Sequence, residues 1–295
     1  MRRHDTAYAL GLLSPALLIF AVVIVLPIAR GIVVSFYDCQ LSNLKNPVWN
    51  AFENYRRLFR SGQIFSYLKT TLIFVCSTVG IQFIIGMCIA LLLNMDVASR
   101  GVLRGLFVIP WTIPSVVVAI LWKWMLQPQF GMLNFLLFKT GLSHTVNIAW
   151  AQDSMLSMVS IVLAALWKEL PYMMVMLLAG LQSVDQSLIE AASIEGANRP
   201  QVFRYVTIPS IRPVIVAAVW ISIMDNFQMF TIIFNMTGGG PVEATTTLSL
   251  ATYKSAFTAY DFGRASAIGV VWMVILIVAA IYFNRLGARS TANYQ

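Results

Sequence analysis

The sequence has few charged residues and several long stretches with none. Asp, Glu, Lys and Arg make up 11% of the 295 residues, whereas hydrophobic residues make up 59%. A soluble globular domain carries about 25% charged residues. The mean hydropathy of +0.77 likewise shows that the chain is apolar overall. The composition therefore excludes an ordinary soluble enzyme and indicates a protein that crosses a membrane several times.

Residues that bind metals or carry out catalysis are also scarce. The three cysteines, Cys39, Cys76 and Cys88, have no metal-binding or redox spacing, and the two histidines, His4 and His144, lie far apart. An intramembrane hydrolase needs a base beside its nucleophile or a metal ion, so this class is disfavoured. We expect no metal site in the chain. No basic run is interleaved with aromatic residues, so nucleic acid is not an expected partner. The formal net charge of +8 fits contact with anionic membrane lipid instead.

Six apolar stretches approach the roughly 20 residues that cross a bilayer as a helix. They cover about residues 7–29, 70–95, 105–126, 154–182, 213–236 and 265–284. We expect an all-α integral membrane protein with a single domain over residues 1–295. With both termini inside the cell, Lys and Arg are equally numerous on the two sides. The inside segments are shorter, however, and so carry the higher positive charge density, which favours cytoplasmic termini.

The external segment between the first two stretches contains a basic cluster, Arg56, Arg57 and Arg60. Residues 54–65 can form an amphipathic helix that lies at the membrane interface with these arginines on its wet face. The role of this segment is left open by its sequence.

The segment 185–212 is unusually polar for its position between two apolar stretches. It carries three acidic and three basic residues, which cannot lie in hydrocarbon. Gly196 can adopt a positive φ and so permits a sharp turn. We expect two short helices at an angle, on the cytoplasmic side. From the residues alone, they are either an ordinary amphipathic loop or a surface for a partner protein.

This segment resembles the Glu-Ala-Ala signature of permease subunits of binding-protein-dependent ABC importers. The matching residues are Glu190, Ala191, Ala192, Glu195, Gly196, Ala197, Phe203 and Pro209. Glu195 stands where that family usually has Asp, and Asp185 stands where Pro is common. Pro110-Trp111 with Pro114, which open the third apolar stretch, and the sequence 237–241, Thr-Gly-Gly-Gly-Pro, resemble the carbohydrate branch of maltose, lactose and glycerol-phosphate permeases. The last feature is typical of the first of the two permeases in such systems.

The resemblance implies six transmembrane helices and a set of partner proteins. These are a second permease subunit, two ATPase subunits and an extracytoplasmic solute-binding protein, all in or on the bacterial inner membrane. The segment 185–212 would be the loop that couples to the ATPases, and Gly239, Gly240 and Pro241 would face the binding protein. The chain has no Gly-x-x-x-x-Gly-Lys-Ser/Thr loop. ATP and Mg²⁺ would therefore be bound by the partner ATPases, so we expect no cofactor and no enzymatic activity in this chain.

Polar residues inside the apolar stretches predict a solute path. Charges in a span are costly and therefore indicate function, which selects Lys168, Glu169 and Asp225. Four residues of the fifth stretch are spaced by three and four and would share one helix face: Ser222, Asp225, Asn226 and Met229. The predicted path residues are Trp167, Glu169, Tyr172, Ser222, Asp225, Asn226 and Met229. A structural ion pair between Lys168 and Asp225, and a packing role for the aromatic residues, remain alternatives.

Aromatic rings stack on sugars, and Asn, Ser and carboxylate groups bind hydroxyls. The solute is therefore expected to be sugar-like: a saccharide, glycoside, polyol or sugar phosphate. The rival function is a secondary transporter of a polar solute driven by an ion gradient, for which Glu169 and Asp225 would carry the coupling charge. The sequence does not identify the solute.

Overall fold

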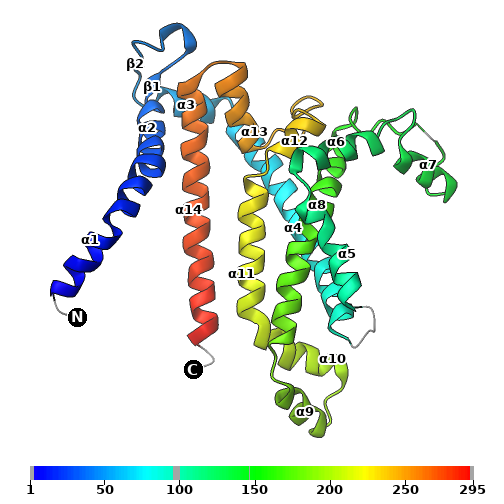
Figure 1. Ribbon diagram of the computed structural model, residues 1–295. Coiled ribbons are helices and arrows are strands. Elements are labelled where there is room, and N and C mark those ends of the chain that lie inside the picture. The colour runs from blue at the N-terminus through cyan, green and yellow to red at the C-terminus, as the bar shows by residue number, and fades with distance from the viewer. Residues whose placement is uncertain (1–2, 96–99, 146, 293–295) are drawn as a thin grey trace. The chain divides into compact units, whose positions relative to one another are not determined.

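The computed structural model describes residues 3–95, 100–145 and 147–292, and almost all regular structure in it is helical (Figure 1). The α-helices are α1 (Arg3–Phe20), α2 (Leu26–Val34), α3 (Glu53–Arg60), α4 (Gln63–Asn94), α5 (Arg100–Thr112), α6 (Ser115–Met125), α7 (Met132–Lys139), α8 (Ser154–Gln182), α9 (Gln186–Ile194), α10 (Arg199–Val202), α11 (Ile208–Phe227), α12 (Thr231–Met236), α13 (Leu248–Tyr253) and α14 (Phe262–Ala292). Short π-helices, η1 (Ala21–Val25), η3 (Phe203–Thr207) and η4 (Lys254–Thr258), and a 3₁₀ turn, η2 (Leu41–Asn43), lie between them. The strands β1 (Tyr37–Asp38) and β2 (Val48–Trp49) form a small antiparallel hairpin.

The chain packs as two compact units, of which the smaller comprises Met1–Ser66 and Ala251–Ile275. Within it, the buried Asn54 amide donates hydrogen bonds of 2.9 Å to the carbonyls of Ser35 and Tyr37. The backbone N–H groups of Phe262 and Gly263 bond to the Cys39 carbonyl. A side chain at Gly263 would collide with the Tyr37 carbonyl. The β1–β2 hairpin is therefore fastened to the start of α14.

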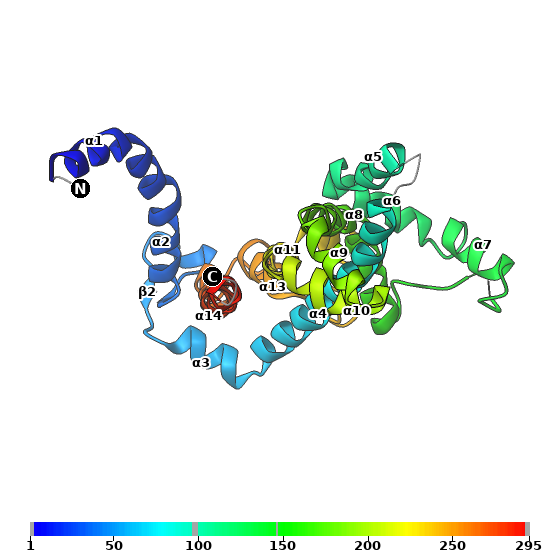
Figure 2. The same cartoon turned by 90° about the horizontal axis from the view of Figure 1, so that it is seen from below.

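The larger unit comprises Tyr67–Leu250 and Leu276–Gln295, and α8 is its central helix. Helices α5, α6, α11 and α12 pack against α8. Seen from below in Figure 2, α7 lies apart from α8 and α11. In this unit, α4 ends, α5 begins and α8 meets α9 at one end, whereas α12 lies at the other end (Figure 1).

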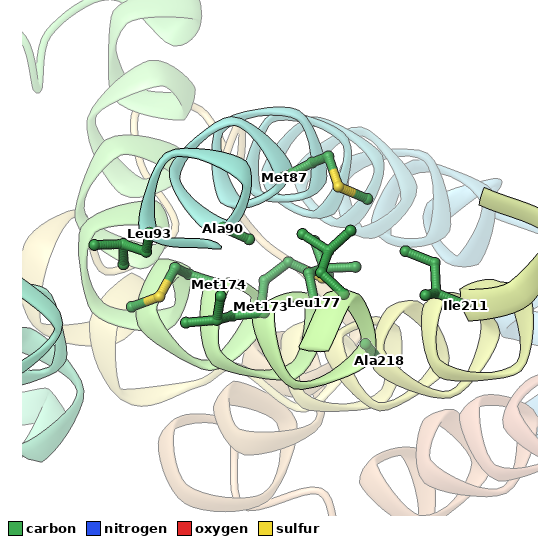
Figure 3. Packing of buried hydrophobic residues seen from close by; sticks show 10 residues of the cluster. Met87, Ala90, Leu93, Met173, Met174, Leu177, Ile211 and Ala218 are labelled. Atoms are coloured by element: carbon green, nitrogen blue, oxygen red, sulfur yellow. The ribbon is translucent and has the colours of Figure 1, made fainter. Parts of the chain in front are cut away.

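The core of the larger unit is an apolar cluster between α4, α8 and α11 (Figure 3). The helices approach closely where glycine replaces a side chain. An added Cβ at Gly86 would lie 3.0 Å from Met173 Cγ, and one at Gly180 would lie 3.1 Å from Val214. Small residues at helix crossings allow such packing in membranes. The fully buried members include Ala90, Met173, Met174, Leu177 and Ala218.

Five helical stretches are long and apolar enough to cross a membrane, and one bent pair makes a sixth. The stretches are Leu12–Val34, Gln63–Asn94, Ser154–Gln182, Arg199–Phe227 and Phe262–Phe283, with the pair α5 and α6. The expected all-α architecture with about six spans is confirmed. The single domain over residues 1–295 stays a prediction.

The third span differs from the continuous helix expected over 105–126. Helices α5 and α6 meet at an angle of 96°. The break lies at Ile113 and Pro114, and Pro114 has a non-helical ψ of 137°. Proline disfavours helical geometry at the residue before it and supplies no N–H of its own. Pro114 therefore ends α5 instead of opening the span.

The fifth span begins and ends at different residues from the expected 213 and 236. The continuous helical stretch starts at Arg199, well before the apolar run, and ends at Phe227. Pro209 lies just after the π-helical turn η3 inside this stretch, where it cannot donate a backbone hydrogen bond to the preceding turn. The chain then leaves the helix at Gln228 and resumes as the short α12. The first span ends later than the expected residue 29, because the helical stretch formed by α1, η1 and α2 continues to Val34.

Candidate functional site

The polar segment 185–212 forms two short helices joined by a sharp turn at one end of the larger unit (Figure 1). Asp185 caps α9 by accepting a hydrogen bond of 2.9 Å from the Ser187 N–H. The hydrogen bonds from the Ser187 backbone and side chain hold the pKa of the Asp185 carboxyl below its ordinary value. Gly196 has a φ of +87° and ends α9, while Asn198 and Gln201 form a capping box at α10. Asp185, which stands where the resembling permeases commonly have Pro, is thus the N-cap of α9.

Helix α9 has one bound face and one free face. Ile189 and Ala192 are half-buried, and Ile189 lines a groove of about 270 Å³ with Val202 and Phe203. The opposite face presents Glu190, Ala191 and Ile194, which are three and four residues apart and exposed. Ile194 is 88% exposed, which is unusual for a large apolar side chain. The free face is therefore an apolar surface with a carboxylate beside it.

The remaining signature residues anchor this pair of helices. Phe203 packs against the apolar core cluster, and Pro209 is half-buried in the first turn of α11. Ala197 is half-buried, whereas Glu195 and Gly196 are exposed at the turn. The helices α9 and α10 are thus joined to the core through η3 and α11.

Four of the predicted path residues, Glu169, Tyr172, Ser222 and Asn226, lie next to the apolar core. Gln82 and Glu169 are one helical turn from Gly86 and Met173, and Ser222 is one turn from Ala218. Gln82 Nε2 donates a 2.6 Å hydrogen bond to the Glu169 carbonyl, which joins α4 to α8. We define the polar layer as Gln82, Glu169, Tyr172, Ser222 and Asn226.

Four groups of this layer are buried without a hydrogen-bond partner among the described residues. They are Gln82 Oε1, the Tyr172 hydroxyl, Ser222 Oγ and Asn226 Oδ1. Leaving a buried polar group unsatisfied costs about 1–3 kcal/mol. Four such groups from three helices indicate a site that receives hydrogen bonds from a solute or water. Asp225 lies near enough to Glu169 and Tyr172 for electrostatic interaction, although it is more exposed.

Aromatic side chains stand beside this layer. The Trp111 and Tyr172 ring centroids are 6.1 Å apart, and those of Trp122 and Trp167 are 6.3 Å apart. Trp167 therefore packs against another tryptophan, which is the packing role considered for it. Trp111 is exposed and contacts Tyr172, so the bent third span contributes a ring to the site.

Lys168 joins α8 to the break in the third span. Its Nζ donates hydrogen bonds to the carbonyls of Trp111 (3.3 Å) and Ile113 (3.2 Å), which the break leaves without helical partners. Its ion-pair partner among the described residues is Glu169, at 3.9 Å, and not Asp225. The proposed Lys168–Asp225 pair is therefore wrong. Lys168 acts as a cap for a broken helix.

Met229 does not share a helix face with Ser222, Asp225 and Asn226, contrary to the spacing argument. Helix α11 ends at Phe227, and Met229 lies in the following turn, buried. Its carbonyl accepts a 3.0 Å hydrogen bond from Ser249 Oγ, which holds the chain out of the helix. Asn226 Nδ2 bonds to the Ser222 carbonyl, a side-chain bond that competes with helix geometry.

The loop after α12 lies at the end of the larger unit away from α9 (Figure 1). Gly238 and Gly239 have φ values of +60° and +91°, and threonine side chains tie the loop together. Thr245 Oγ1 contacts Thr237 Oγ1 at 2.7 Å and donates to the Gly240 carbonyl at 3.0 Å. Gly239 is buried, and Gly240 and Pro241 are half-buried.

The exposed tip of this loop is therefore not its glycine run but the residues just after it. Val242 is 97% exposed, and Glu243 is exposed beside it. Sequence reasoning missed Val242, Gln82 and Trp111. Gln82 had a signal, because it is an amide side chain in the middle of an uncharged, mostly apolar stretch.

Relatives among known proteins match over nearly the whole chain, and three of them illustrate the similarity. The trehalose/maltose transport system permease protein MalF of Thermococcus litoralis is 31% identical, over 94% of this chain and 92% of the relative. The sulfoquinovosyl glycerol permease protein SmoG of Agrobacterium fabrum is 31% identical, over 95% and 90%. The inner membrane ABC transporter permease protein YcjO of Escherichia coli is 32% identical, over 96% and 94%.

The fold is shared with a chain of a bacterial ABC transporter that imports the acidic polysaccharide alginate. That chain matches with a TM-score of 0.81 at 24% identity, covering 97% of this chain and 96% of its own length. Residues 82–290 match the model of the family described as binding-protein-dependent transport system inner membrane component. The chain belongs to this family of inner-membrane transport proteins.

Proposed function

We propose that this chain is a permease subunit of an ATP-driven importer that moves a sugar or sugar-like solute inward from an extracytoplasmic binding protein. The observation that carries the solute class is the polar layer, with four unsatisfied hydrogen-bonding groups, of which the Tyr172 hydroxyl belongs to a ring that contacts Trp111. Hydroxyl-rich solutes supply both donors and acceptors to such groups, and their apolar ring faces pack on aromatic rings. Two of the relatives are named for their solutes, trehalose or maltose for MalF and sulfoquinovosyl glycerol for SmoG. These solutes belong to this class.

The free face of α9 supports docking of a separate ATPase subunit. It combines the exposed Ile194 with Glu190, and the helix is joined to the core by Phe203. A rigid connection of this kind can pass movement from a docked partner to α11, which carries Ser222 and Asn226. ATP and Mg²⁺ would be bound by that partner.

Charge distribution supports a cytoplasmic position for α9. The loops and helix starts at its end of the larger unit carry Arg100, Arg104, Arg199, Arg204 and Arg212. The opposite end carries Lys69, Lys123 and Lys139 in the corresponding segments. Positive residues near span ends favour the inside. The loop with Val242 would then face the binding protein outside, and a second permease subunit would complete the path.

The test is uptake in proteoliposomes that contain the chain with its second permease, ATPase subunits and binding protein. Radiolabelled maltose, trehalose and a sulfonated glycoside form the solute panel. We expect uptake of at least one of them with ATP on the ATPase side. Leaving out the binding protein should abolish it. Uptake driven by a proton or sodium gradient in the absence of ATP would contradict the proposal and favour a secondary transporter.

A further inference from the structure

A polar cavity in the smaller unit has no part in the proposed transport path. Its volume is about 280 Å³. Helix α3, the turn before α4 and the start of α14 form its walls, and Leu58 forms an apolar side. The polar residues that line it are Asn54, Arg57, Ser61, Gln63, Asp261 and Arg264.

Arg264 is the residue that points to a ligand. Its Nη2 donates a 2.7 Å hydrogen bond to Gln63 Oε1, which fixes the guanidinium group at the cavity. Its Nε is buried and has no acceptor among the described residues. A guanidinium presents its donors as a rigid fork that matches carboxylate and phosphate groups. The free Nε therefore lacks an acceptor of this kind.

The lining of the cavity carries one more positive than negative formal charge. Arg57 and Arg264 are positive, and Asp261 is the acidic residue among the residues that line it. The Asp261 carboxylate accepts a 2.9 Å hydrogen bond from the Arg264 backbone N–H and so serves as a helix cap. Glu53 lies on the flank of α3 and contacts Arg57 Nε at 3.2 Å.

Helix α3 has the surface of a helix that lies on a membrane. Phe52 and Phe59 are 68% and 47% exposed, and Arg56 and Arg60 are exposed beside them. Asn54 and Leu58, on the opposite face, are buried in the protein. Only Ser61 and Gly62 separate α3 from the transmembrane α4. About two turns of α4 separate α3 from the apolar stretch that starts at residue 70, which places α3 near the bilayer surface, where aromatic and arginine side chains meet lipid headgroups.

We propose that the cavity between Arg57 and Arg264 binds the phosphate group of an anionic phospholipid. The exposed phenylalanines next to the arginines favour lipid, because an amphipathic helix at the bilayer surface places its aromatic side chains among the acyl chains and its arginines among the headgroups. The acyl chains would lie along the exposed face of α3. Such a lipid would satisfy Arg264 Nε and fix α3 to the membrane surface. This site is independent of the proposed transport function.

The experiment measures lipid retained by the full-length protein after release from nanodiscs of mixed phosphatidylglycerol and phosphatidylcholine. Native mass spectrometry counts each lipid on the wild type, Arg264→Gln, Arg57→Gln and Arg60→Gln. Arg60→Gln is the matched control, since it removes an equal charge from α3 outside the cavity. We expect Arg264→Gln to lower phosphatidylglycerol retention at least about tenfold, as for a lost hydrogen bond to a charged group. Arg60→Gln should lower it by no more than about fivefold, the worth of one surface charge.

Further measurements separate the other readings. Melting of the detergent-purified protein should be raised by phosphatidylglycerol and not by inorganic phosphate alone. An equal rise with inorganic phosphate, lost in Arg264→Gln, would show a site for a free anion and overturn the lipid assignment. Equal losses of phosphatidylglycerol in Arg264→Gln and Arg60→Gln would show that the cavity is not the binding site. Retention of phosphatidylcholine equal to that of phosphatidylglycerol would show that the site does not select an anionic lipid. Either result would overturn the proposal. If Arg264→Gln does not fold, Arg57→Gln is compared with Arg60→Gln instead, and its phosphatidylglycerol retention should fall at least about tenfold. Weakened docking of the binding protein with unchanged lipid retention would also contradict the proposal.

Discussion

Replacing Glu190 with lysine should abolish ATP-driven uptake while the protein still folds and inserts. Glu190 is exposed in the middle of α9, so the change removes no described contact. Lysine and glutamate have similar helix propensities, and surface substitutions usually change stability by less than about 0.5 kcal/mol. If the free face of α9 meets a basic rim on the ATPase, the reversed charge costs several kcal/mol at that interface. Uptake should therefore fall at least about thirtyfold, the equivalent of roughly 2 kcal/mol.

Two readouts accompany this uptake measurement: co-purification of the ATPase subunit and the melting temperature of the permease. Both Glu190→Lys and a control, Ser210→Lys, should melt like the wild type. Ser210 is exposed on α11, at the end of the larger unit that carries α9 and α10, so the control adds positive charge away from the free face. Only Glu190→Lys should lose the ATPase. Normal co-purification and uptake in Glu190→Lys would remove this face from the coupling mechanism.

Replacing Asn226 with leucine should block solute uptake without weakening the fold. The Asn226 side chain is buried, and its Oδ1 has no partner among the described residues. Leucine has a similar size and removes an unsatisfied group that costs about 1–3 kcal/mol, so the melting temperature should stay equal or rise. A solute hydroxyl would then face an apolar side chain and lose its hydrogen bond. We expect uptake to fall at least about tenfold, since 1.4 kcal/mol corresponds to a factor of ten.

The chain offers a matched control for this change. Asn235 Nδ2 bonds to the Thr231 carbonyl four residues earlier, as Asn226 Nδ2 bonds to the Ser222 carbonyl. Asn235→Leu therefore breaks an equivalent helical bond outside the polar layer and should leave uptake within about twofold, since an intramolecular hydrogen bond contributes only modestly. A lower melting temperature for Asn226→Leu with full uptake per folded molecule would assign Asn226 a purely structural role.

Hydropathy located the spans but not all of their ends, for physical reasons visible in two helices. The helical stretch that contains α11 begins at Arg199, outside the membrane. Hydropathy does not reveal where a helix begins in such a water-exposed segment. The end at Phe227 depends on the hydrogen bond from Ser249 to Met229, a contact over 20 residues of chain. Neither limit follows from the local sequence. As a result, the spacing argument placed Met229 on a helix face that it does not share.

The bend in the third span had a local signal, Pro110 and Pro114. Proline alone does not determine a bend, because α8 continues as a helix through Pro171. The difference lies in what satisfies the backbone. At the bend, the Lys168 side chain donates to the carbonyls of Trp111 and Ile113 from another helix. Such a partner is distant in sequence, so its position could not be predicted.

The polar segment was the most predictable part of the candidate site. Asp185, Gly196 and Asn198 are residues whose local chemistry caps or turns a helix, and the structure uses them so. The solute path was less predictable. Gln82 belongs to the polar layer only because α4 packs in register with α8 at Gly86 and Met173.

The two ends of the larger unit provide the most direct test of the account. Ile194 on α9 and Val242 on the opposite loop are 88% and 97% exposed, so a cysteine at either position is open to reagent. A membrane-impermeant maleimide should label Ile194→Cys in inverted vesicles and Val242→Cys in right-side-out vesicles, above the background of the unmodified chain. Labelling of Ile194→Cys from outside the cell would place α9 away from any cytoplasmic ATPase and contradict the proposed mechanism.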